Sequence, residues 1–272
     1  VNKYGEPVNY ENYITLEEAK EIDEDLEIGD FMNYDLEFEN MGRNAATILH
    51  INFEYRLQRF IEENIVSKYK DKIGKTVSGT VSRVDKQDNT YIEIGEVKGV
   101  LQRKSRIKGE SFKVGDTLKA VVKGVNIDKS NGLLVDLSRT SPKFLENLLT
   151  LEVPELKDKK VTIESSARIP GTRSKIALST IDGQIDPIGA VVGVKGVRIG
   201  AVSKQLHGEN IDCVEFSTIP EMFISRALSP AMVNSVKIEK APANGEKGKA
   251  IVTIPSDQKS KAIGKAGLNI RL

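Results

Sequence analysis

Apolar residues change their spacing several times along this chain, and each change predicts a different kind of element. Between residues 42 and 70 they recur every three or four positions, which predicts one long helix with a single apolar stripe. Between residues 71 and 139, valine, isoleucine and threonine recur in short alternating runs separated by turn-forming residues. These runs predict strands at 76–84, 90–94, 99–101, 117–125 and 133–137. Short helices and strand pairs follow, so the fold class is predicted to be multidomain α+β.

The long helix follows an acidic segment in which residues 28–30 predict a turn and residues 31–38 predict a strand. The apolar stripe of the helix consists of Ala46, Leu49, Phe53, Leu57, Phe60 and Ile61. Packing in a core is the default role of such a stripe. A helix of this length at the edge of a domain can also act as a rigid connector.

Five short strands in about 65 residues favour a small closed barrel of the OB type. Residues 75–84, 91–95, 112–116 and 134–139 resemble the S1 RNA-binding domain. In such a barrel Tyr91 on the second strand either stacks on a base or packs in the core. Arg103, Lys104 and Arg106 lie in a basic run after the third strand, where we expect phosphate contacts rather than a merely solvated surface.

Two short helices are predicted on either side of Gly193-Val194-Lys195-Gly196, and a strand is predicted after the second helix. Glycines without Cβ atoms allow a close approach of another backbone. The N–H groups at the start of the second helix, together with Lys195 and the nearby Arg198, favour an anion. This pattern resembles the GXXG loop of the KH fold, which clamps about four nucleotides. A C-capped helical turn is the alternative.

A second copy of the pattern, Gly264-Lys265-Ala266-Gly267, favours a sugar-phosphate site over two ordinary turns. The first module has the order helix, strand, strand, helix, GXXG, helix, strand, with residues 168–174 as a basic turn between its first two strands. That order is the type II arrangement of KH domains. The second module stops at Leu272 before a final helix and strand, so we expect it to be incomplete.

The net charge of +1 hides an uneven distribution of charge. Residues 1–40 contain 13 acidic and two basic residues, a net charge of −11, whereas the remaining residues contain 26 acidic and 38 basic residues, a net charge of +12. An acidic head and a basic body suggest a protein partner for the first and a nucleic acid for the second. The alternative for the head is a simply solvated face.

Several classes of function find no support in the sequence. No apolar run approaches the length of about 18 residues that a membrane span requires. Residues 73–76 end like a phosphate-binding P-loop, but Tyr69 stands where that motif requires glycine. With two histidines and no HExxH, GxSxG or CxxC motif, we expect no catalytic site, metal or cofactor. Cys213 is expected to be a buried structural thiol, and a reducing cytoplasm fits a lone cysteine.

The order of an S1 domain and two KH domains behind an acidic head resembles one family, the NusA transcription elongation and termination factors of bacteria. The matching stretches are residues 138–144, 151–156, 170–176, 186–189, 208–212, 227–231, 255–258 and 262–265. The resemblance implies that residues 1–70 are the later part of an α/β domain that binds RNA polymerase, ending in a connector helix. It implies an S1 domain at 71–139 and KH domains at 140–219 and 220–272, the second of them truncated.

Nascent single-stranded RNA and RNA polymerase are therefore the expected partners, and other transcription elongation or antitermination factors are further candidates. The resemblance implies effects on pausing, intrinsic termination and antitermination. Residues 101–108 depart from the family because they are more basic, which puts any base contact carried over to them in doubt. Two alternatives stay open at this stage. One is an RNA-processing accessory associated with an exoribonuclease, and the other is a ribosome-associated translation protein.

Overall fold

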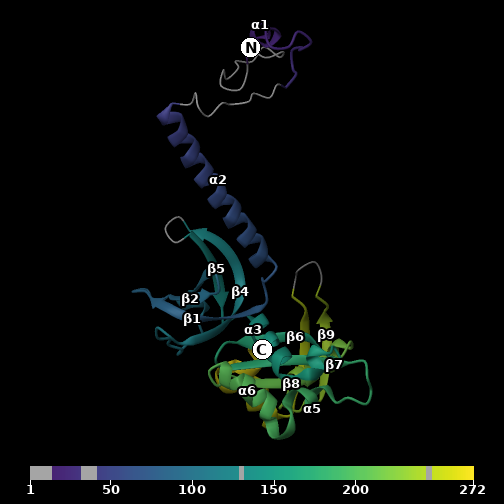
Figure 1. Cartoon of the computed structure of the whole chain (residues 1–272). Helices are drawn as coiled ribbons and strands as arrows, with labels where there is room; N and C mark the ends of the chain where they lie inside the picture. The colour runs from purple at the N-terminus through teal and green to yellow at the C-terminus, as the bar shows by residue number, and fades with distance from the viewer. Residues whose placement is uncertain (1–13, 32–41, 129–131, 243–246) are drawn as a thin grey trace. The chain divides into compact units, whose positions relative to one another are not determined.

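The computed structural model describes residues 14–31, 42–128, 132–242 and 247–272. The chain divides into two compact units, Val1–Arg59 and Phe60–Leu272 (Figure 1). In the first unit α1 (Leu16–Lys20) begins with a capping box. The Thr15 hydroxyl accepts from the backbone N–H of Glu18, and the Glu18 carboxylate accepts from the backbone N–H of Thr15. The Thr15 hydroxyl also donates to the Glu18 carboxylate at 2.8 Å, and this bond, followed by the one from the Thr15 backbone, holds the pKa of Glu18 below its usual value.

The predicted long helix is confirmed as α2 (Arg43–Lys70). The turn predicted at residues 28–30 is also present, while the strand predicted at 31–38 falls almost entirely outside the described residues. The apolar stripe of this helix is exposed among the described residues, and its packing in a core stays a prediction. Phe53 is 64% exposed and Phe60 is 63% exposed. Apart from α2, the described part of the first unit contains only the five-residue α1, and a helix that short cannot cover a stripe of this length.

The predicted OB-type barrel is confirmed, and it opens the second unit. Its strands are β1 (Thr76–Val84), β2 (Thr90–Ile94), β3 (Val97–Leu101), β4 (Thr117–Asp128) and β5 (Gly132–Ser138). They follow the order β1-β2-β3-β5-β4, and pairing of β4 with β1 closes the barrel. The β3–β5 pair is parallel and the other pairs are antiparallel.

The last turn of α2 contributes to the core of the barrel. Tyr69 is only 5% exposed, and it packs in the cluster that contains Val81, Ile92 and Leu101. Its hydroxyl donates to the carbonyl of Ile94 at 3.1 Å, which satisfies the polar end of the ring. The residue that rules out a P-loop therefore has a structural role in the barrel.

The first module after the barrel contains α3 (Pro142–Glu152), α4 (Pro154–Lys157), β6 (Val161–Ile169), β7 (Arg173–Thr180), α5 (Pro187–Val192), α6 (Val197–Gln205) and β8 (Asn210–Glu215). Its sheet has the order β6-β7-β8, with β6–β7 antiparallel and β7–β8 parallel. This confirms the predicted order of elements. Helices α3, α5 and α6 cover the sheet through a core that includes Phe144, Leu148, Ile176, Val191 and Val202.

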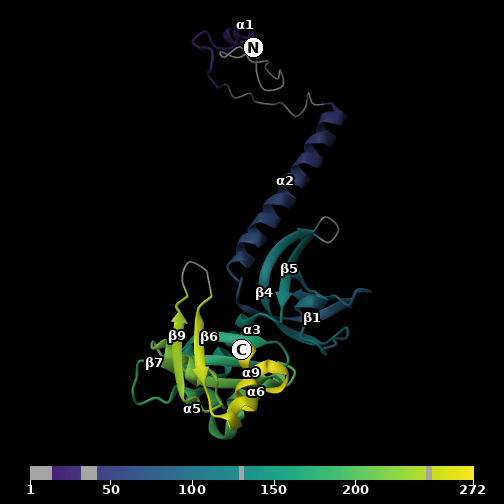
Figure 2. The same cartoon turned by 180° about the vertical axis from the view of Figure 1, so that it is seen from behind.

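The second module contains α7 (Pro220–Ala227), β9 (Ser235–Lys240), β10 (Lys249–Thr253), α8 (Lys259–Ile263) and α9 (Leu268–Arg271), drawn in yellow-green to yellow in Figure 2. Strands β9 and β10 form an antiparallel pair. A buried lysine connects the two modules. Lys175 on β7 is 5% exposed and its ammonium donates to the carbonyls of Ala227 and Ser229 at the end of α7. Desolvation lowers the pKa of Lys175.

A buried ionic network joins the barrel to the first module. Arg139 donates to the carboxylate of Glu110, with an Nη2–Oε1 distance of 2.6 Å, and also to the carbonyl of Gln205 on α6 at 2.7 Å. Arg168 donates to Glu209 and to the carbonyls of Arg139 and Ser141, each of these carbonyls at 2.8 Å. The barrel and the first module are therefore held together by contacts that leave these charges paired.

Candidate nucleic-acid interface

The first GXXG turn has a backbone that only certain residues tolerate. Helix α5 begins at Pro187 behind Asp186, whose carboxylate caps it by accepting from the N–H of Ile188 at 3.0 Å. It ends at Gly193, with φ 74° and ψ 171°, a region of backbone space that is almost confined to glycine. Gly196 is left-handed, with φ 75° and ψ 17°, and α6 starts at the next residue. The chain thus reverses between two helices within four residues.

The second turn repeats this geometry. Gly264 has φ 73° and ψ 169°, and Gly267 has φ 74° and ψ 17°, so both glycines match their counterparts in the first turn within two degrees. The third residue of each motif is left-handed as well, with φ 53° at Lys195 and φ 54° at Ala266. Two ordinary helix ends would not be expected to share three unusual backbone conformations in the same order. The repeat that the sequence suggested is therefore a repeat in three dimensions.

The two turns differ in where they carry the positive charge. In the first turn the lysine is the third residue, Lys195, and in the second turn it is the second residue, Lys265. Both lysines are exposed, and Val194 at the tip of the first turn is 83% exposed. Each turn thus offers one ammonium group beside backbone that lacks Cβ atoms at its two ends.

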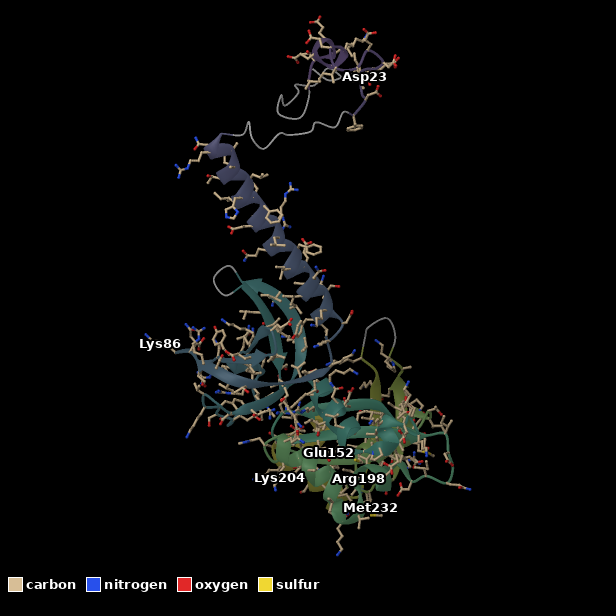
Figure 3. The ribbon with its side chains drawn as sticks, in the orientation of Figure 1. Asp23, Lys86, Glu152, Arg198, Lys204 and Met232 are labelled. Atoms are coloured by element: carbon tan, nitrogen blue, oxygen red, sulfur yellow. The ribbon has the colours of Figure 1, made fainter. Side chains whose placement is uncertain are left out.

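Arg198, which the sequence predicted as part of the RNA site, makes hydrogen bonds within the protein. Its guanidinium donates to the carbonyl of Ala190 on α5 at 2.6 Å and to the carboxylate of Glu155 at 2.8 Å, and the side chain is 33% exposed. These bonds join α6 to α5 across the turn. The contacts seen here are structural, and a contact between Arg198 and RNA stays a prediction. Figure 3 labels Arg198 within this module.

The equivalent position in the second module is Asn269, five residues after the first glycine of the motif, as Arg198 is in the first module. Its amide donates to the carbonyl of Lys261 at 3.1 Å, and Lys261 stands three residues before the first glycine, as Ala190 does. A Cβ on Gly193 would lie 2.8 Å from the Arg198 side chain, and one on Gly264 would lie 2.8 Å from Asn269. The first glycine of each motif therefore leaves room for the residue that ties the turn.

In the barrel, Tyr91 is neither fully buried nor free. It is half-buried on β2, and the guanidinium of Arg83, its cross-strand neighbour, lies 4.2 Å from the centre of the ring. Such a cation–π contact covers one face of the ring. Sequence reasoning did not single out Arg83, although the register of a two-strand pairing could have suggested it.

The basic run after β3 contains both exposed residues and a residue that is held in an internal ion pair. Arg103 and Lys104 are exposed on a short 3-10 turn. The Arg106 side chain is only 10% exposed and is held by both carboxylate oxygens of Asp88, with an Nη1–Oδ1 distance of 3.1 Å. The hydrogen bonds from Arg106 lower the pKa of Asp88. Little of Arg106 is therefore left to face a phosphate.

Two further titratable side chains, Cys213 and His50, lie away from the GXXG turns in the sequence. Burial, followed by the neighbouring Asp212, raises the pKa of Cys213 to about 12, so the thiol stays protonated at neutral pH. His50 is exposed beside Glu54, at 3.4 Å. Within the described residues no three His, Cys, Asp or Glu side chains gather where they could hold a metal, and no helix is long and apolar enough to cross a membrane.

Comparison with known protein families covers three parts of the chain. Residues 2–59 match the NusA N-terminal domain, residues 139–216 match the NusA-like first KH domain, and residues 220–272 match the NusA-like second KH domain.

Curated relatives match nearly the whole chain. A Helicobacter pylori protein is 45% identical over 96% of this chain and 70% of its own length. A Thermus thermophilus protein is 39% identical over 95% of this chain and 65% of its own length, and a Bacillus subtilis protein is 34% identical over 95% and 68%. Each of these relatives is named "Transcription termination/antitermination protein NusA".

A closed OB-type barrel followed by two modules with repeated GXXG turns defines a multidomain protein with an S1-like barrel and tandem KH domains. Three family models match this chain, and so do relatives along nearly its whole length. The chain belongs to the NusA family.

Proposed function

We propose that this protein is a transcription elongation factor that binds RNA polymerase and nascent single-stranded RNA, and thereby modulates pausing, intrinsic termination and antitermination. One observation carries the proposal: two GXXG turns with matching backbone geometry lie in a chain of the NusA family. Its matched relatives are named as termination/antitermination proteins. The role proposed is one of binding rather than catalysis, with a cytoplasmic location.

The turns supply the RNA grip. Their glycines let a sugar-phosphate backbone come close, and their lysines face solvent where a phosphate can reach them. The residues that we propose to contact RNA are Gly193, Val194, Lys195, Gly196, Gly264, Lys265, Ala266 and Gly267, with Tyr91, Arg103 and Lys104 on the barrel. Arg198 and Arg106, which the sequence predicted as RNA contacts, hold internal partners, so we assign them a supporting role.

The acidic first unit supplies the contact with polymerase. Residues 2–59 match the NusA N-terminal domain, and residues 1–40 carry a net charge of −11. A polymerase-bound first unit would raise the local concentration of the RNA-binding body near emerging RNA toward roughly the millimolar range. A modest RNA affinity is then sufficient for an effect on transcription.

Charge reversal at the first turn tests the RNA grip. Val194→Asp combined with Lys195→Asp places two negative charges where phosphates are expected, and the cost is about 2 kcal/mol, or roughly thirtyfold in RNA affinity. A matched control, Ile181→Asp with Lys157→Asp, makes the same charge change at exposed positions of the same module. RNA binding is measured by fluorescence anisotropy and folding by thermal melting. If the turn variant loses less than twofold in RNA affinity and keeps a native melting curve, this turn is not part of the binding site.

The polymerase partner needs a separate test. A pull-down with the whole chain, probed for RNA polymerase, RNA-degradation enzymes and ribosomal proteins, should recover polymerase selectively. Recovery of an exoribonuclease or of ribosomal proteins in place of polymerase would contradict the proposed function.

A further inference from the structure

A cavity of about 490 Å³ lies where the barrel meets the first KH module, and its lining is unusual in charge. Three lysines line it: Lys104 after β3, Lys123 on β4, and Lys143 at the start of α3. Four residues with side-chain hydroxyls line it as well, Ser138 and Ser141 among them, and none of the described residues of the lining is acidic. Clustered ammonium and hydroxyl groups without a carboxylate match the chemistry of a phosphate group.

The walls of the cavity are fixed by hydrogen bonds, so the site exists before any ligand arrives. The amide of Asn147 on α3 donates to the carbonyl of Gly74 at 2.7 Å and to the hydroxyl of Thr76 at 3.1 Å. On the other side the backbone N–H of Arg139 donates to the carbonyl of Ser105 at 2.8 Å. A preformed site loses less entropy on binding than a site that must be assembled.

The lysines, rather than the start of the helix, provide the attraction. The first N–H groups of α3 are already used, because those of Lys143 and Phe144 donate to the side chain and the carbonyl of Ser141. The ammonium of Lys143 lies 2.7 Å from a carboxylate oxygen of Glu146, whose other oxygen accepts from the Ser166 hydroxyl. The Lys143 side chain is 65% exposed, so the lysine can turn from this carboxylate toward a phosphate. The ammonium groups of all three lysines belong to exposed residues.

We infer that this cavity, the lysine cavity, is a phosphate site that holds the backbone of an RNA strand as the strand passes from the S1-like barrel to the first KH module. The inference rests on the proposed RNA binding and extends it to a site that neither the GXXG turns nor the barrel provides alone. RNA is the occupant because Lys104 belongs to the exposed basic turn of the barrel, while Lys143 belongs to the KH module. A strand that contacts both domains has to cross the residues between them.

The test removes the three charges and compares the result with an equal loss of charge elsewhere. The cavity variant carries Lys104→Ala, Lys123→Ala and Lys143→Ala, and the control variant carries Lys86→Ala, Lys113→Ala and Lys157→Ala. The control positions are exposed, lie outside the cavity, and divide in the same way between barrel and KH module. Figure 3 shows Lys86 at the outer tip of the barrel, away from the KH ribbon.

RNA binding is measured over a range of salt with an unstructured strand of about 12 nucleotides and with one of about four, which fills a single GXXG site. For the longer strand the cavity variant should bind roughly tenfold more weakly, and its salt slope should be smaller by about two, since each phosphate contact contributes about 0.7. The shorter strand should bind both variants alike. An affinity loss for the longer strand no greater than that of the control would overturn the inference. If melting shows the cavity variant to be unfolded, the three Lys→Gln changes replace it under the same criteria.

Two further arms separate this proposal from its alternatives. If a nucleoside triphosphate binds the intact protein and not the cavity variant, while RNA affinity matches that of the control, the site serves a free nucleotide and the RNA assignment is wrong. The Val194→Asp, Lys195→Asp variant tests the GXXG turn alone. Loss of RNA binding in that variant but not in the cavity variant would overturn only the cavity, and the reverse result would overturn only the turn.

Discussion

At the scale of single residues, each GXXG turn depends on the contrast between its two glycines. Gly193 has a backbone conformation almost confined to glycine, and a Cβ there would meet the Arg198 side chain at 2.8–3.1 Å. Gly196 is left-handed, but a Cβ there would have its nearest neighbour at 3.9 Å. The first glycine is therefore required both by its backbone conformation and by the space that the Arg198 side chain occupies, and the second by its backbone conformation alone.

Alanine at these two positions should separate the constraints. We expect Gly193→Ala to lower the free energy of unfolding by about 1–3 kcal/mol and to cost more than Gly196→Ala, for which backbone strain alone predicts about 1–2 kcal/mol. Adding Arg198→Ala should recover part of the first loss and none of the second. The measurement is urea unfolding of the single and double variants. Equal losses for both glycines, with no coupling to Arg198, would contradict the role of Arg198 in holding the turn.

The cysteine provides a second prediction at this scale. Because burial raises the pKa of Cys213 to about 12, the thiol should react with a disulfide reagent at pH 8 at least tenfold more slowly in the folded protein than in urea. The same shift means that the thiol of Cys213 contributes fully to the free energy of unfolding below its pKa in the unfolded chain, near 8.5. This contribution should be lost as the pH rises from there toward 12. Equally fast labelling of the folded and unfolded protein would show that the thiol is exposed.

The sequence could identify the GXXG turns because their glycines stand at fixed spacing, but it could not show what their neighbours do. Arg198 on α6 could as well have faced solvent, and only the fold brings it to the carbonyl of Ala190. Arg106 donates to Asp88, which lies 18 positions away in the sequence, and no local pattern indicates this partner. Charged side chains are therefore the residues for which sequence reasoning most needs a structure.

At the scale of elements, alternation of apolar and polar residues predicted β1 and β2 with their observed bounds, because each strand has one buried face. The same alternation could not predict strand residues whose charged side chains are buried. The segment 168–174 was predicted as a basic turn, yet Arg168 lies within β6, which ends at Ile169, and Arg173 begins β7. The Arg168 and Glu209 side chains are both fully buried as an ion pair, with an Nε–Oε1 distance of 2.8 Å.

Breaking this pair should be costly. Arg168→Ala leaves the Glu209 carboxylate buried without its partner, for which we expect a loss of about 3–5 kcal/mol in the free energy of unfolding. The control Lys249→Ala removes the partner of Glu239 in an exposed pair and should cost less than about 1 kcal/mol. Chemical unfolding measures both variants. Similar small losses in the two would mean that the buried network does not hold the barrel and the first module together.

At the scale of the whole molecule, the split of charge after residue 40 predicts two functional parts, and the chain divides into two compact units after Arg59. The structure adds where they can be separated. Tyr69 belongs to the barrel core, so a cut after residue 70 would damage the barrel, whereas the division between the units falls after Arg59. Sequence periodicity could not reveal this, because α2 is one uninterrupted helix from Arg43 to Lys70.

The most direct test of the account compares the whole chain with a variant that lacks residues 1–59 in a purified transcription assay that records pausing and termination. The variant keeps both hydrophobic cores of the second unit, so its RNA affinity should stay within about twofold of that of the whole chain. Its effect on pausing should largely vanish at the same concentration, because the RNA-binding body is no longer held near the emerging RNA. If the shortened protein altered pausing as strongly as the whole chain does, the first unit would not be the contact with polymerase and the RNA-binding body would act alone.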